Sequence, residues 1–259
     1  MAPAPTIARR RRPPLHWKLG VSVRKRWHRL RKLWRPERAL EDVPYFGATF
    51  RVEPRDVIGN ELILKRFEWL QIPAMLAACR ELKPAAFIDI GANFGLYTCI
   101  IGRQKFAERL IAFEPNEAVI GRLTDHIVRN GVTGVEIHET AVGATHHKAA
   151  LQLGAPGFDA LTSVVETPGQ NSGGEIDVVT LDETLSFKSQ PLIFKIDVEG
   201  YELEVLKGGE NLFAQNYGYA QIESFEDERA ATVISTMARF GWRWADHIVD
   251  DFIFRRDKI

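Results

Sequence analysis

The sequence predicts an α/β domain built around a doubly wound, mostly parallel sheet. Three observations lead to this prediction. Short apolar runs alternate with segments of helical periodicity from residue 60 onward, the first of these runs ends in a glycine-containing loop, and residues 242–257 have the pattern of two antiparallel strands. A chain of 259 residues suits one such domain, or one domain with a tail.

The first half of the domain alternates helices with short apolar strands. Helical segments repeat apolar residues every three or four positions, as Val119, Leu123 and Ile127 do, and Asn130-Gly131 is a helix stop signal. The expected elements are a long helix over 60–82, a strand over 85–90, a helix over 93–104, a strand over 109–114, a helix over 116–130 and a strand over 135–142.

The second half opens with a different pattern. Residues 148–181 consist of short alternating pieces separated by Gly, Pro and Ser, which indicates a hairpin-rich excursion. The alternation of strands and helices then resumes. The expected elements are a strand over 192–197, a helix over 201–213, a strand over 219–224, a helix over 227–240 and the antiparallel pair over 242–257.

The charge distribution divides the chain into a tail and a body. From Met1 to Arg38 the sequence holds thirteen Lys or Arg residues and one acid, while the remainder holds 21 basic and 33 acidic residues. We expect residues 1–44 to form a basic, partly disordered tail and residues 45–259 to form the domain. Apolar residues at helical spacing with basic residues between them indicate an amphipathic helix in the tail, and we expect residues 9–35 to bind an anionic membrane surface. The alternative is a helix that packs on its own domain.

The composition excludes several classes of protein. Hydrophobic residues make up 45% and charged residues 26%, as in ordinary globular proteins. The two cysteines lie in apolar, helix-like sequence, which argues against a disulfide framework and a zinc site. No apolar run has the length of a bilayer, and no signal-peptide core follows the first arginines. We expect a cytoplasmic protein whose tail can hold it at the inner membrane surface.

The loop "DIGANFG" joins the first strand to the next helix. Gly91 allows a tight turn, and Gly95 allows close packing or the approach of a ligand to the backbone. Asn93 stands where the dinucleotide-binding fingerprint has its second glycine, the residue that lets a pyrophosphate approach the backbone. The loop therefore favours a cofactor without a pyrophosphate.

Two acids near this loop narrow the choice of cofactor. Glu114 ends the second strand, where doubly wound proteins place the acid that binds ribose hydroxyls. Asp89 adds a carboxylate that suits a cationic ligand. Positive charge, ribose and the lack of a pyrophosphate together describe S-adenosylmethionine. The residues expected to bind it are Asp89, Gly91, Asn93, Gly95, Glu114 and Asn116.

Longer motifs point to a known family. The chain contains, in order, the segments "FIDIGANFGLYT", "AFEPNEAVIGRLTDHIVRNGV", "TAVG", "TLDETL" and "FKIDVEGYELEVLKGGENLF". In order and spacing these segments resemble the FkbM family of S-adenosylmethionine-dependent methyltransferases over residues 80–226. The resemblance implies a class I methyltransferase (Rossmann-like) fold whose sheet is mostly parallel with an antiparallel C-terminal strand pair. It also implies methyl transfer, commonly to a hydroxyl oxygen of a sugar or a secondary metabolite.

Three acids are the candidate catalytic residues. Asp197 and Glu199 follow the fourth parallel strand, and Glu223 ends the strand beside it. A hydroxyl acceptor needs a base, or a metal that lowers its pKa. Neighbouring carboxylates could serve as base and orienting group, or they could bind Mg²⁺ together. The alternative is that Asp197 and Glu199 only cap the helix that begins near Tyr201.

The leading functional hypothesis is an O-methyltransferase that acts on a hydroxyl of a glycan, a glycolipid or a secondary metabolite. A second hypothesis is a nucleic-acid methyltransferase whose basic tail binds phosphates. The acidic body and the lack of an "NPPY"-type motif after the fourth strand argue against it. A third is a non-catalytic scaffold that still binds S-adenosylmethionine, which the retained acids at positions 197, 199 and 223 argue against.

Overall fold

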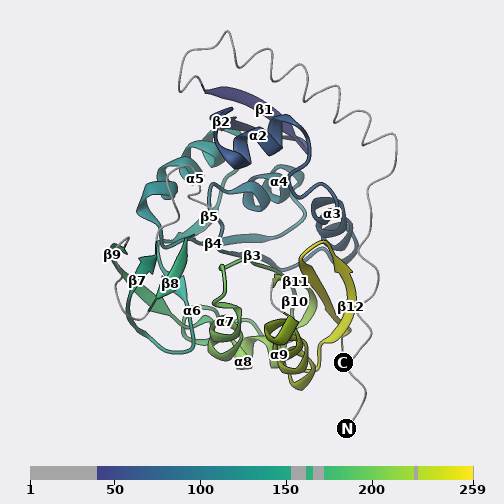
Figure 1. Cartoon of the computed structure of the whole chain (residues 1–259). Coiled ribbons are helices and arrows are strands. Elements are labelled where there is room, and N and C mark those ends of the chain that lie inside the picture. The colour runs from purple at the N-terminus through teal and green to yellow at the C-terminus, as the bar shows by residue number, and fades with distance from the viewer. Residues whose placement is uncertain (1–39, 153–161, 166–171, 225–226, 259) are drawn as a thin grey trace.

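The computed structural model describes residues 40–152, 162–165, 172–224 and 227–258. Its centre is a seven-stranded sheet in the order β12-β13-β11-β10-β3-β4-β5, whose strands are parallel except at the β11–β13 and β13–β12 pairs (Figure 1). The strands are β12 (Arg243–Ile248), β13 (Asp251–Arg256), β11 (Tyr217–Glu223), β10 (Pro191–Ile196), β3 (Ala86–Ile90), β4 (Arg109–Phe113) and β5 (Val135–His138). This topology confirms the predicted mostly parallel sheet and its antiparallel C-terminal pair.

Helices cover both faces of this sheet (Figure 1). One face packs against α3, α4 and α5, and the other packs against α6, α7, α8 and α9. A hairpin packs on the outer side of α4 and α5. The hairpin consists of β1 (Glu41–Tyr45) and β2 (Ala48–Val52). The helices are α2 (Val57–Ile63), α3 (Gln71–Leu82), α4 (Leu96–Gln104), α5 (Glu117–Arg129), α6 (Leu181–Thr184), α7 (Glu202–Gly208), α8 (Glu210–Gln215) and α9 (Asp227–Arg239).

Two expectations concern the N-terminal region: a tail over residues 1–44 and a membrane-binding segment over residues 9–35. The hairpin begins at Glu41, inside the segment 1–44 that the charge distribution assigns to the tail. The expected membrane-binding segment 9–35 lies outside the described residues. None of the helices in the part of the chain that the structure describes combines the length and the apolar character that a bilayer crossing demands.

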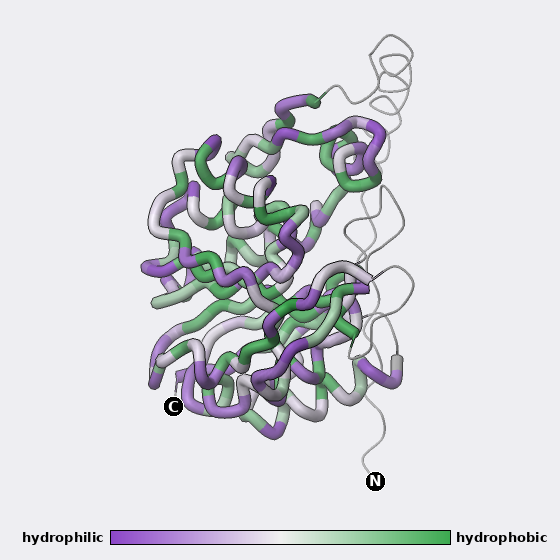
Figure 2. Tube along the Cα trace, turned by 90° about the vertical axis from the view of Figure 1, so that its left-hand side faces the viewer, coloured by the Kyte–Doolittle hydropathy of each residue, from purple (hydrophilic) through white to green (hydrophobic). Residues whose placement is uncertain are grey.

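The alternation of side chains along each strand builds two hydrophobic cores. In β3, Phe87 joins the core under α3–α5, while Ala86 and Ile88 join the core under α6–α9. Figure 2 shows the apolar stretches running along the strands in the interior. The same alternation places a row of polar residues on the α3–α5 face. Each of them lies two or four positions along the chain from a residue of that core, such as Phe87, Ile193 or Tyr219. The polar residues are Asp89, Lys195, Asp197, Gln221, Glu223 and Asp251.

The predicted excursion over 148–181 forms a second, smaller sheet. Its order is β6-β9-β7-β8, with β6 (Ala141–Val142), β7 (His147–Gln152), β8 (Ser163–Val165) and β9 (Ser172–Val179). The single strand expected over 135–142 is therefore divided between two sheets. The division has a plain cause: His138 pairs with Phe113, the last residue of β4, so the chain loses its central-sheet partner at that point.

The long helix expected over 60–82 is instead two helices, α2 and α3, separated by a turn over residues 64–70. Pro73 explains the break. Proline has no backbone N–H and clashes with the preceding helical turn, so it is tolerated only in the first turn of a helix. Because α3 begins at Gln71, Pro73 lies in that first turn. Glu68, in the turn itself, has a φ of 50°.

The helix expected over 201–213 is also divided, into α7 and α8 at Gly208 and Gly209. A Cβ atom on Gly208 would lie 1.9 Å from the carbonyl oxygen of Gly143. The glycine pair therefore lets α7 pack closely on the loop after β6 and weakens the helix where it ends.

Gly91 lies where a side chain cannot fit. Its φ is +80°, and a Cβ atom would lie 1.8 Å from the carbonyl oxygen of Asp197. We expect Gly91→Ala to lower the free energy of unfolding by about 3 kcal/mol, from the strained φ and the displaced β10 loop. Gly131→Ala is the matched control, because its φ is +60° but its Cβ would meet nothing within 4 Å. It should cost about 1 kcal/mol. Urea denaturation measures both, and equal losses would contradict the role of the close approach.

Candidate functional site

A cavity of about 390 Å³ lies at the carboxyl ends of the parallel strands, the edge where doubly wound sheets bind ligands. It is lined by the β3–α4 loop, by residues after β4 and β10, and by the turn between α2 and α3. Eight of the nine sequence-predicted site residues lie on its wall. They are Asp89, Gly91, Asn93, Glu114, Asn116, Asp197, Glu199 and Glu223.

Gly95 is the ninth, and its contact with the cofactor stays a prediction. It is absent from the cavity wall, and a Cβ atom there would lie 2.5 Å from Leu123 Cδ1. With a φ of +84°, it forms the N-cap of α4 and lets that helix pack tightly on α5. Its role in the structure is close packing, the first of the two uses expected for a glycine at this position.

Glu114 connects the β3–α4 loop to the loop after β4. These two loops hold most of the residues expected to bind the cofactor, and we call them the cofactor half of the site. Glu114 Oε2 accepts a hydrogen bond from the Asn93 backbone N–H at 2.8 Å, and its Oε1 accepts one from the Asn116 N–H at 2.8 Å. Burial raises the pKa of Glu114 to about 7. Each carboxylate oxygen has two lone pairs, so these bonds leave acceptor capacity for the hydroxyls of a ligand. The side chain of Asn116 caps α5 by accepting from Ala118 N–H.

Asp89 lies deeper than Glu114 and is 2% exposed. Its Oδ2 accepts hydrogen bonds from both the backbone N–H and the hydroxyl of Thr98, at 3.0 and 2.6 Å, which fixes it to the first turn of α4. Burial raises the pKa of Asp89 to about 6, although the bonds from Thr98 oppose this shift. At neutral pH this carboxylate therefore adds negative charge to the floor of the cavity.

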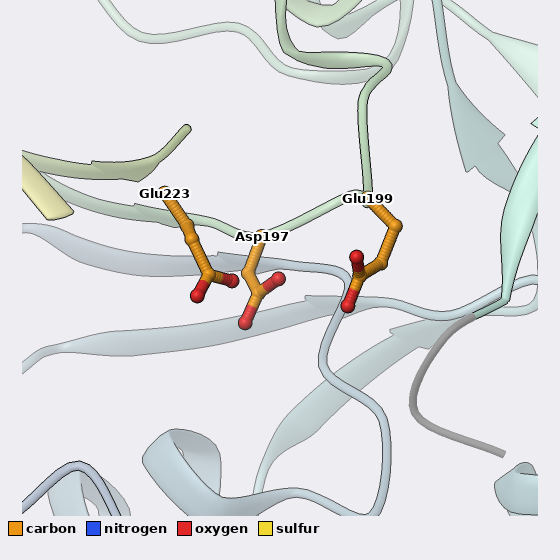
Figure 3. A group of neighbouring side chains, drawn as sticks. All are labelled: Asp197, Glu199 and Glu223. Carbon is orange, nitrogen blue, oxygen red and sulfur yellow. The ribbon is translucent and has the colours of Figure 1, made fainter. Parts of the chain in front are cut away.

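Asp197, Glu199 and Glu223 come together at the ends of β10 and β11, with one oxygen of each within 4.8 Å of the others (Figure 3). Burial, with Asp197 beside it, raises the pKa of Glu223 to about 11. Although burial opposes it, the ammonium of Lys195 and a hydrogen bond with Glu223 hold the pKa of Asp197 below its usual value. The pair therefore shares one proton, with Glu223 protonated and Asp197 ionised.

Glu199 reaches this group from a strained turn. Its φ is 48°, a left-handed conformation that is uncommon outside glycine, and Gly200 follows with a φ of 102°. Burial and the charge of Asp197 raise the pKa of Glu199 to about 7. Two other cavity residues, Glu68 and Asn93, have φ values of 50° and 47°. Backbone strain of this kind concentrates at functional sites.

The alternative in which Asp197 and Glu199 cap the following helix does not fit the position of that helix. The N-cap of α7 is Tyr201, and no side-chain bond caps it. The first turn already contains Glu202, whose Oε1 accepts from Gly200 N–H at 2.7 Å. Asp197 and Glu199 instead turn their carboxyl groups toward Glu223 (Figure 3).

Lys195 lies beneath the acids and is 2% exposed. Its Nζ is 3.0 Å from Asp251 Oδ1 and 3.5 Å from Asp197 Oδ2. Burial works against its charge, but Asp197 and Asp251 outweigh burial and raise the pKa of Lys195 well above its ordinary value. Lys195 is therefore a buried counter-charge for the acids.

Sequence reasoning missed four residues around this lysine, which are Glu68, Tyr97, Gln221 and Asp251. Glu68 Oε2 accepts from the hydroxyl of Tyr97 at 2.7 Å, and the Tyr97 oxygen accepts from Gln221 Nε2 at 2.9 Å. Burial and the charge of Asp251 raise the pKa of Glu68 to about 8. Asp251, from the C-terminal hairpin, is fully buried and lies opposite Glu223 in the β11–β13 register.

The residues present fit S-adenosylmethionine in two respects. Asn93 Oδ1 is buried and accepts no hydrogen bond from the described residues, so it can receive a donor from a ligand. Glu114 and Asp89 offer carboxylates for hydroxyl and cationic groups on the same wall. The three-acid group offers the oxygen ligands that Mg²⁺ prefers, but the fixed Lys195 ammonium already supplies positive charge 3.5 Å from Asp197. The magnesium site therefore stays a prediction.

Comparisons with known proteins place the chain among methyltransferases. The family described as Methyltransferase FkbM domain matches residues 89–248. "Hexuronic acid methyltransferase AglP" of Haloferax volcanii is 29% identical over 155 residues, which span 58% of this chain and 61% of that protein. "Methyltransferase 1" of Beauveria bassiana is 25% identical over 177 residues, 59% of this chain and 71% of that protein. The chain thus spans less than two thirds of the first relative.

Among solved structures, a methyltransferase from Pyrococcus furiosus aligns with 90% of this chain and 96% of its own, at 13% identity and a TM-score of 0.46.

Proposed function

Because the chain belongs to the FkbM methyltransferase family and has the class I methyltransferase fold, we propose that it is an S-adenosylmethionine-dependent O-methyltransferase. The proposed acceptor is a hydroxyl of a glycan, a glycolipid or a secondary metabolite. The observation that carries this proposal is one cavity lined both by the Asn93–Glu114 contact and by the three carboxyl groups of Asp197, Glu199 and Glu223. The relative named as a hexuronic acid methyltransferase supports a sugar-like acceptor.

In this proposal Glu199 is the general base. When bound, S-adenosylmethionine supplies a methyl group that its sulfonium already activates, so the protein must orient the acceptor hydroxyl and take up its proton. A base works best when its pKa lies near the working pH, and that of Glu199 is about 7. Asp197, held ionised by Lys195, can accept a hydrogen bond from a second hydroxyl of the acceptor and so orient the reacting one toward Glu199.

Cofactor binding is the first test. Calorimetric titration with S-adenosylhomocysteine, with and without Mg²⁺, should give a micromolar Kd. A Kd or acceptor turnover that depends on Mg²⁺ would move Asp197, Glu199 and Glu223 from the acid–base role to a metal site. Lack of binding in both conditions would contradict the proposed function.

Glu114→Gln tests the cofactor half of the site. We expect it to weaken S-adenosylhomocysteine binding about 10- to 100-fold, because an amide replaces a charged acceptor of hydroxyl hydrogen bonds. The same titration measures the change. Glu136→Gln is the control, since Glu136 pairs with Arg109 on the surface with 43% of its side chain exposed. An unchanged Kd for Glu114→Gln would remove Glu114 from the proposed cofactor site.

A further inference from the structure

The described wall of the cavity is strongly unbalanced in charge. It carries seven carboxyl side chains and one cationic side chain, and it has no Arg or His. The acids are Asp56, Glu68, Asp89, Glu114, Asp197, Glu199 and Glu223, and the cation is Lys195. Glu223 is protonated and therefore neutral, but none of the seven acids can supply positive charge to an anionic ligand.

Lys195 cannot serve an anionic ligand either. Its ammonium lies between two carboxylates, at 3.0 Å from Asp251 and 3.5 Å from Asp197, and its side chain is 2% exposed. An anion that paired with it would have to displace one of these contacts inside the protein. Displacing a contact of a buried charge is costly, because it leaves the former partner unpaired.

Much of the rest of the described wall is apolar or aromatic, and includes Val57, Ile58, Phe67, Val164 and Tyr201. Carboxyl groups and apolar side chains in one cavity suit a ring with hydroxyls and an apolar face.

We infer that the part of the acceptor that enters this cavity carries no negative charge, and that the substrate class is a neutral glycoside rather than a uronate or a phosphosugar. The inference rests on the proposed methyl transfer and narrows its acceptor. It separates this chain from the relative whose name specifies a hexuronic acid. Like charges brought together in a binding site are the usual means of rejecting the wrong partner.

The test compares paired acceptors on the full chain with S-adenosylmethionine. Methyl glucoside, galactoside and mannoside are each matched with the uronate that differs only at carbon 6, and methylation is followed by mass spectrometry. We expect kcat/KM for at least one neutral glycoside to exceed that for its uronate by about 100-fold or more. A uronate that is used as well as its neutral partner would overturn the inference and leave the methyltransferase proposal intact. Methylation of neither member of any pair would contradict the proposed acceptor class itself, and the inference with it.

Each assay is repeated with EDTA and with Mg²⁺. A uronate that becomes a substrate only with Mg²⁺ would also overturn the inference, because the three-acid group would then supply positive charge through a metal.

A variant that adds a positive charge to the cavity wall checks that electrostatics cause the preference. Val57, the first residue of α2, lines the cavity and is 46% exposed. Val57→Lys should reduce the preference for the neutral glycoside about tenfold, while Val57→Gln, of similar length without charge, should not. Equal effects of the two variants would contradict an electrostatic origin.

Discussion

Glu199→Gln should lower kcat about 1,000-fold and abolish its dependence on pH near neutrality. In the unmodified protein kcat should rise with pH and level off above about 7, because Glu199 acts as a base only when it is ionised and its pKa is about 7. Glutamine keeps the shape of the side chain but cannot accept a proton. Steady-state rates from pH 5 to 9, with the acceptor saturating, measure both effects.

Two companion variants sharpen this result. Glu204→Gln, on the surface of α7 beside Lys207, is the control and should leave the profile unchanged. Asp197→Asn should also lower kcat, but should shift the remaining pH profile to lower pH, because the charge of Asp197 raises the pKa of Glu199. A Glu199→Gln enzyme with the original rate and profile would remove Glu199 from the role of base.

Lys195→Met should lower the free energy of unfolding by about 3–5 kcal/mol. Methionine matches the length of lysine, but it leaves Asp251 and Asp197 without the ammonium that lies 3.0 and 3.5 Å from them. The double variant Lys195→Met with Asp251→Asn should regain part of the loss, because the most deeply buried of the stranded charges is then gone. Urea denaturation with a constant m-value is the measurement.

The exposed pair Lys207–Glu204 provides the matched control for the lysine substitution. Lys207→Met should cost less than about 1 kcal/mol, since the Lys207 side chain is 59% exposed and water already screens the pair. A loss of similar size for Lys195→Met and Lys207→Met would show that the buried ammonium contributes no more than a surface one.

Much of the sheet and of the cofactor half could be predicted, because both depend on local patterns. The strand at 85–90 is a short apolar run followed by a glycine turn, and the structure has β3 at Ala86–Ile90 with Gly91 in that turn. Glu114 follows the next such run and does contact the loop that contains Asn93. Periodicity and spacing within about thirty residues were enough for these features.

The polar neighbours of Lys195 on β10 and β11 could also be predicted from the sequence. A strand in the middle of a parallel sheet is buried on both faces, so a lysine inside it must have a buried partner. Alternation from Ile193 places Lys195 and Asp197 on one face, and alternation from Tyr219 places Gln221 and Glu223 on the same one. Once the order of the strands is known, the row of polar side chains follows from the alternation of side chains between the two faces of the sheet.

Glu68 and Asp251 could not be predicted, because they reach the site through long-range packing. Glu68 lies in a stretch with helical periodicity, and its position depends on a turn of which Pro73 is the only local sign. Asp251 lies in a hairpin whose pairing with β11 sets it opposite Glu223. No spacing in the sequence relates these residues to the strands that they serve.

Pro73 and the C-terminal hairpin have a practical consequence for how this chain can be cut or recombined. The family match covers residues 89–248, yet Glu68 lies before it and Asp251 after it. A chimera joined at those limits would keep nearly all of the recognisable motifs and would lose Glu68 and Asp251 from the charge network around Lys195. Exchange of parts among relatives should therefore preserve activity only when the crossover points lie upstream of α2 and downstream of β13. The segment that must be exchanged as a whole is thus longer than the segment that the family match covers.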